Sequence, residues 1–155
     1  MIKDINNEKR LKEIAAELKE VALKALLLTS VGRLNQRRPS FNQPEIAGKG
    51  GVKAQLFKIN LIGCLVEAGW SIISSNGDFP SLRTMKYGIE AGIESRWPNG
   101  SISLDDIRRL IRECKPKPNI VLLLTYWRLS NRAYRTIMDW SRSKNIITSI
   151  FYLMH

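Results

Sequence analysis

The chain has 155 residues, 44% of them hydrophobic, which is enough for a single domain with its own core. No apolar run approaches the roughly 20 residues that span a bilayer, and the charged N-terminus lacks the apolar core of a signal peptide, so we expect a cytoplasmic protein with no membrane partner. The one histidine is His155, the last residue, which argues against Ser-His-Asp or Cys-His catalysis and against histidine-based metal sites. The formal net charge of +11 points to a polyanionic partner.

The two cysteines, Cys64 and Cys114, lie far apart in the sequence, and neither has a second cysteine or a histidine at a metal-binding spacing. Two isolated thiols do not form a disulfide framework. We therefore expect both to be small buried hydrophobic side chains.

The first predicted element is a long helix over about 7–28, where apolar residues recur every three or four positions. Its polar face carries the pairs Glu8–Lys12 and Glu20–Lys24 in the favourable i,i+4 orientation. Acids and bases nearly cancel along this face. We therefore expect the helix to contribute a solvated surface and not a phosphate-binding one.

A basic loop rich in glycine and proline is predicted at 29–51, where the helical periodicity stops. A glycine turn before the next helix would place backbone N–H groups and lysines at a helix N-terminus, an arrangement that holds phosphate. The loop and the first turn of that helix together carry the cationic candidates Arg33, Arg37, Arg38, Lys49 and Lys53.

The remaining residues, 52–155, predict an α/β (or α+β) core within the same single domain: a small mixed sheet flanked by helices. The continuous apolar run at 120–124 favours a strand that is covered on both faces. The stretch 82–97 fits either a helix or a strand, and its two glycines favour a strand at 86–94. The other expected elements are helices at 52–68, 103–114 and 131–144, and strands at 70–75, 120–127 and 146–153.

Arginine and aromatic side chains are concentrated near the C-terminus, and residues 115–145 hold seven basic residues against one acid. A helix beginning near 131 would carry its arginines on one face and its apolar residues on another. Guanidinium groups bind phosphates and exposed aromatics stack on bases. The alternative is that the aromatics are core residues and the arginines a solvated face. The candidates for phosphate binding here are Arg128, Arg132, Arg135 and Arg142.

Acidic residues form a third constellation, because Asp78 follows a predicted strand and Glu90 and Glu94 share one face of the next. Three carboxylates could hold Mg²⁺, which activates water and neutralises a phosphodiester transition state. The order of elements around Gly77-Asp78 and Glu94-Ser95-Arg96 resembles the core of PD-(D/E)xK nucleases over about residues 52–127.

The resemblance implies metal binding by Asp78 and Glu94, with Arg96 in the place of the catalytic lysine and Glu67 as a helix-borne acid. The sequence departs from the family pattern twice. Proline follows the aspartate, as Phe79-Pro80, where the family has proline before it, and arginine stays protonated where lysine could relay a proton. Both departures count against nuclease activity and favour a degenerate nuclease over an active one.

The leading hypothesis is a protein that binds DNA or RNA, mainly through electrostatic phosphate contacts from the two basic segments. The second is the Mg²⁺-dependent nuclease, and Mg²⁺ is a cofactor only in that case. The third is a small regulatory module that docks its basic surface on an acidic protein partner. We expect binding without catalysis.

Overall fold

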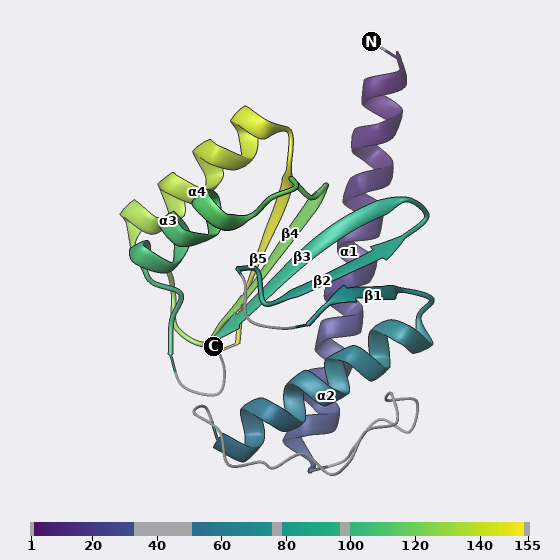
Figure 1. The fold of residues 1–155 in the computed structure, drawn as a ribbon, viewed down its shortest axis with the longest axis vertical. Coiled ribbons are helices and arrows are strands. Elements are labelled where there is room, and N and C mark those ends of the chain that lie inside the picture. The colour runs from purple at the N-terminus through teal and green to yellow at the C-terminus, as the bar shows by residue number, and fades with distance from the viewer. Residues whose placement is uncertain (1, 33–50, 76–78, 97–99, 154–155) are drawn as a thin grey trace.

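The structure is a computed structural model that describes residues 2–32, 51–75, 79–96 and 100–153 (Figure 1). A single five-stranded sheet lies between two layers of helices (Figure 1). In chain order, the elements are α1 (Ile2–Ser30), α2 (Gly51–Glu67), β1 (Ser71–Ser74), β2 (Leu82–Lys86), β3 (Ile89–Arg96), α3 (Leu104–Glu113), β4 (Ile120–Thr125), α4 (Asn131–Lys144) and β5 (Ile147–Tyr152).

The strands follow one another across the sheet in the order β1-β2-β3-β4-β5. Strand β2 is antiparallel to both of its neighbours, whereas β3, β4 and β5 run parallel. The parallel connections pass through α3 and α4, which pack against each other on one face of the sheet, while α1 and α2 cover the other face (Figure 1). The expected α/β class with a mixed sheet is confirmed.

Strand β4 lies between the two layers and is buried along its whole length. Ile120, Leu122 and Leu124 point into the core beneath α1 and α2. Val121 and Leu123 point into the core beneath α3 and α4. All five are at most 1% exposed, so the run of apolar residues forms a strand covered on both faces, as predicted.

The helices agree closely with the sequence prediction. Helix α4 spans 131–144, and it ends at Asn145, whose left-handed φ of 56° terminates the helix. Helix α3 begins after Ser103, whose side chain accepts a hydrogen bond from the Asp106 N–H while the Asp106 carboxylate accepts one from the Ser103 N–H. Among the described helices, none contains an apolar stretch that could span a bilayer.

The ambiguous stretch 82–97 contains a hairpin of two strands, β2 and β3, where the sequence indicated one strand at 86–94. The reversal falls at Tyr87 and Gly88, whose φ angles are 55° and 74°. A two-residue turn with positive φ at both positions matches the twist of the strands that it joins. Tyrosine is unusual in that conformation, so the sequence carried a weak turn signal.

The predicted basic loop falls largely outside the described residues, which omit 33–50. Four of its phosphate-binding candidates therefore lie outside them: Arg33, Arg37, Arg38 and Lys49.

The cysteines are described, and both are buried as predicted, with Cys64 2% and Cys114 3% exposed. Burial raises the pKa of the Cys114 thiol, so this side chain stays uncharged at neutral pH.

Gly92 allows the chain that enters β2 to pack closely against β3. A Cβ at this position would lie 2.5 Å from Cγ of Pro80, well inside van der Waals contact. We predict that Gly92→Ala lowers the free energy of unfolding by about 1–3 kcal/mol, because the proline ring has to move out of a packed position. Urea unfolding measures this. A variant as stable as the wild type would show that Pro80 does not pack on β3.

Candidate nucleic-acid interface

The carboxyl ends of the three parallel strands meet at one edge of the sheet. Arg96, Thr125 and Tyr152 occupy adjacent positions there in the register of β3, β4 and β5. Ligands of open α/β sheets commonly bind outside the carboxyl ends of the strands. This edge contains Glu94, one of the three acidic candidates, and the start of the arginine-rich segment.

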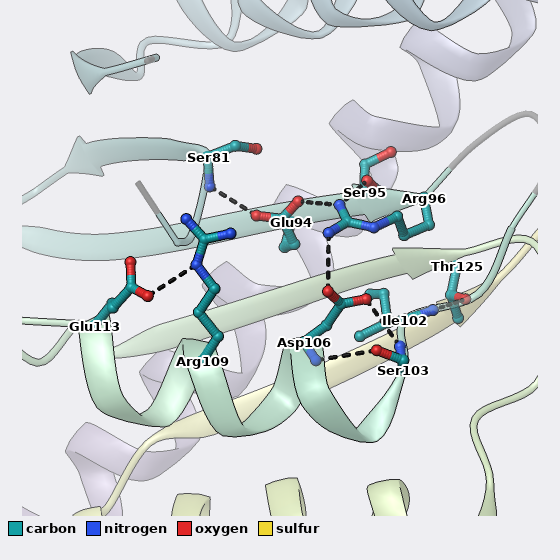
Figure 2. Close-up of polar contacts among 10 residues, drawn as sticks. All are labelled: Ser81, Glu94, Ser95, Arg96, Ile102, Ser103, Asp106, Arg109, Glu113 and Thr125. Carbon is teal, nitrogen blue, oxygen red and sulfur yellow. Dashed lines mark hydrogen bonds and ion pairs between the residues drawn. The ribbon is translucent and has the colours of Figure 1, made fainter. Parts of the chain in front are cut away.

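An ion-pair network around the buried Glu94 carboxylate, which we call the Glu94 network, links β3 to the start of α3 and to the residue before β2 (Figure 2). The Glu94 side chain is only 4% exposed, and its Oε2 lies 2.7 Å from the Arg96 guanidinium. Its Oε1 accepts a hydrogen bond of 2.9 Å from the Ser81 N–H. Arg96 also reaches Asp106 at 3.2 Å. Each oxygen of this buried carboxylate therefore has a partner, as a buried charge requires.

The Phe79 ring packs against the arginine of the Glu94 network and against a second arginine from α3. The guanidinium groups of Arg96 and Arg109 lie 5.2 Å and 4.4 Å from the ring centroid, within cation–π range. Arg109 extends from α3 toward β3 and is also held by Glu113 at 2.8 Å (Figure 2). Two arginines, one from β3 and one from α3, thus lie against the same aromatic ring.

The structure separates the other candidate metal ligands from Glu94. Glu90 shares its face of β3, but four residues of strand place it about 13 Å away along the chain, and it pairs with Arg83 at 3.0 Å. Glu67 lies at the end of α2, in the layer on the opposite face of the sheet, and contacts Lys24 at 2.8 Å. Asp78 lies outside the described residues.

No group of three or more histidine, cysteine, aspartate or glutamate side chains within the described ranges could hold a metal ion.

Beyond β4 the chain makes a tightly hydrogen-bonded turn. The Tyr126 N–H donates to the carbonyls of Arg96 at 3.1 Å and Gly100 at 3.2 Å, and the Trp127 N–H donates to Gly100 at 3.3 Å. The Thr125 hydroxyl donates to the Trp127 carbonyl at 2.9 Å. Despite this fixed backbone, the Trp127 side chain is 49% exposed.

Helix α4 presents its arginines to solvent, as the sequence predicts. Ala133 and Ile137 are fully buried, and Trp140 packs against the same core. Asp139 is the only acid of the helix, and it lies 3.9 Å from Arg142. The predicted separation of a cationic face from an apolar face is confirmed.

Three exposed arginines at the start of this segment form what we call the arginine surface: Arg128, Arg132 and Arg135. None of them has a carboxylate within ion-pair distance among the described residues. The arginines of the neighbouring helix α3 differ, because Arg108 pairs with Asp105 and Arg112 with Glu113. The positive potential of the helical layer is therefore concentrated on α4 and the turn before it.

The described part of the first basic segment lies elsewhere. Lys53 is exposed in the first turn of α2, which covers the opposite face of the sheet from α4. Lys58 donates a hydrogen bond of 2.6 Å to the Ser75 carbonyl. The structure therefore does not bring Lys53 onto the face that carries the arginine surface.

Comparison with protein-family models, with curated proteins and with solved structures finds no match to this chain.

Sequence reasoning missed two parts of this edge. Asp106 is recognisable as the acid of a capping box, but the same carboxylate also reaches Arg96. The Ser81 N–H, which donates to Glu94, is a backbone group and leaves no signal in the sequence. The spacing of Glu94 and Arg96 in a strand was the one clue to their contact, since residues two apart share a face.

The Glu94 network gives a stability prediction. Arg96→Met leaves the buried Glu94 carboxylate without its cation, and we expect the free energy of unfolding to fall by about 2–4 kcal/mol. The double variant Glu94→Gln/Arg96→Met should lose less than the sum of the two single variants, because neither charge is then left unpaired. Urea unfolding of the four proteins measures the coupling.

Arg108→Met is the matched control, because its pair with Asp105 is exposed, at 52% and 92% for the two side chains. A surface pair of this kind contributes at most about 1 kcal/mol. If Arg96→Met were no more destabilising than Arg108→Met, the network would not hold the strand edge together.

Proposed function

We propose that this protein binds nucleic acid, with phosphates held by the arginine surface at the start of α4. The observation that carries the proposal is that Arg128, Arg132 and Arg135 are all exposed with no described carboxylate in ion-pair distance. Arginines without a carboxylate partner keep their N–H donors for an external anion. A phosphate accepts two parallel hydrogen bonds from one guanidinium, which makes it the best matched anion.

The helix itself adds to this potential. The arginine surface lies at the amino end of α4, where the helix dipole and the unpaired N–H groups favour an anion. Ser130 caps the Ala133 N–H and contributes no charge. By contrast, the first turn of α3 carries Asp105 and Asp106, which cancel the same effect there. The two helices are neighbours, and α4 is the one that favours a polyanion.

The proposal predicts a strong salt dependence. Neutralising the arginine surface in Arg128→Gln/Arg132→Gln/Arg135→Gln should weaken binding to a fluorescent oligonucleotide. It should also reduce the slope of log affinity against log salt by about 2–3, close to one for each lost phosphate contact. Fluorescence anisotropy between low and physiological salt measures both quantities.

A charge-matched control neutralises three exposed lysines of α1, which lies on the other face of the sheet: Lys9→Gln/Lys12→Gln/Lys24→Gln. This variant has the same net charge as the arginine variant and should bind with nearly the wild-type slope. Equal losses in both variants would show that net charge alone, and not the arginine surface, attracts the nucleic acid. Retention of an acidic protein with no affinity for DNA, RNA or heparin would favour the protein-docking alternative.

A Mg²⁺-dependent nuclease is the second candidate, favoured by the placement of Glu94 and Arg96. Both side chains lie on one face at the carboxyl end of β3, within an α2-β1-β2-β3-α3-β4 order that agrees with the PD-(D/E)xK resemblance. Against catalysis, Arg96 is already engaged by two carboxylates, those of Glu94 and Asp106. A bound metal would be held by Asp78 and Glu94.

We therefore predict binding that persists in EDTA and an oligonucleotide that stays intact when Mg²⁺ or Mn²⁺ is added. Gel analysis of a labelled strand after incubation tests this. Metal-dependent cleavage that disappears in both Asp78→Asn and Glu94→Gln would instead establish the nuclease.

A further inference from the structure

Trp127 combines a large exposed side chain with a fixed backbone. Its indole is 49% exposed, whereas Trp70 is 2% exposed and Trp140 packs against the core. Single exposed hydrophobic residues are common on proteins and require no function by themselves. Trp127 differs from an ordinary exposed hydrophobic residue because hydrogen bonds fix its backbone.

Both peptide groups around Trp127 are hydrogen-bonded to the body of the protein. Its N–H donates to the Gly100 carbonyl at 3.3 Å, and its carbonyl accepts from the Thr125 hydroxyl at 2.9 Å. Thr125 is fully buried, and its hydroxyl also accepts a bond of 3.1 Å from the Ile102 N–H. The turn is therefore anchored to β4 and to the chain leading into α3.

The indole also has an aromatic support. The Tyr126 ring lies 5.2 Å from the Trp127 ring, centroid to centroid, at an interplanar angle of 81°. Such an edge-to-face contact restricts the rotation of both rings. A side chain that is already ordered loses little entropy when it binds, so an anchored exposed indole is a preorganised binding surface.

Cationic residues follow Trp127 closely along the chain. Arg128 is the next residue, and its guanidinium is held over the Tyr152 ring at 5.7 Å from the centroid. Arg132 follows in the first turn of α4. A ligand that presented an aromatic ring together with a chain of anionic groups would fit this arrangement, with its ring on Trp127 and its anions on the arginine surface.

We propose that Trp127 is a stacking platform for an unpaired base, so that the preferred ligand is single-stranded nucleic acid. This inference rests on the proposed function and specifies its substrate class. A base in a duplex is stacked on both sides and its face is covered, whereas a base in a single strand can leave its neighbours and stack on an indole. The backbone phosphates of the same strand then contact Arg128 and Arg132.

The test compares a fluorescent single strand of about 15 nucleotides with a duplex of the same sequence, by anisotropy at one fixed salt concentration. The wild type should bind the single strand at least about tenfold more tightly than the duplex. Trp127→Ala should weaken single-strand binding by about 5- to 150-fold, the loss of one base–aromatic stack. It should leave duplex binding unchanged, and Trp127→Phe should retain most of the affinity.

Tyr87→Asn is the matched control, since it removes another exposed aromatic, 69% exposed, from a turn at the far end of the hairpin. Asparagine tolerates the left-handed φ of 55° at this position. This variant should bind both probes as the wild type does.

Two results would overturn the inference in different ways. If Trp127→Ala bound the single strand as the wild type does, while the arginine variant lost affinity for both probes, Trp127 would not stack and the proposed function would stand. If the wild type bound neither probe at low salt, the proposed function would fail and this inference with it.

Discussion

The burial of β4 on both faces is the constraint on which the rest of the structure depends. Five consecutive apolar side chains from Ile120 to Leu124 are almost wholly removed from water, and this is stable only if helices cover the strand on both sides. Helices α1 and α2 form one cover, and α3 and α4 form the other. Because α4 must turn Ala133 and Ile137 toward β4, the helical period sends its arginines outward.

The same sheet fixes the chemistry at its carboxyl edge. Gly92 allows Pro80 to pack against β3, and the next residue, Ser81, then directs its N–H at Glu94. Arg96 joins this carboxylate to the first turn of α3 through Asp106. Three segments that are distant in the sequence are tied together by one buried charge, which would be costly to leave unpaired. The network stabilises the edge, and it leaves Arg96 engaged by two carboxylates.

Features set within one helix or strand, such as its bounds and caps, could be predicted from the sequence. Features set by contacts between elements, such as ion pairs, could not. The bounds of α4 and the capping box of α3 follow from local rules. The hairpin at Tyr87 was obscured because a tyrosine takes a turn position that usually holds asparagine or glycine. The exposure of α4 arginines followed from periodicity. That Arg132 and Arg135 have no carboxylate within ion-pair distance among the described residues did not follow from periodicity, since it depends on which acids the neighbouring helix brings near.

We propose that nucleic acid contacts the turn after β4 and the start of α4. The most direct test is to titrate ¹⁵N-labelled protein with a short single-stranded oligonucleotide and to follow its backbone amide signals. We expect the largest changes in amide shift at 127–135 and small ones along α1, which lies on the opposite face of the sheet. Changes concentrated on α1, with 127–135 unaffected, would contradict this proposal.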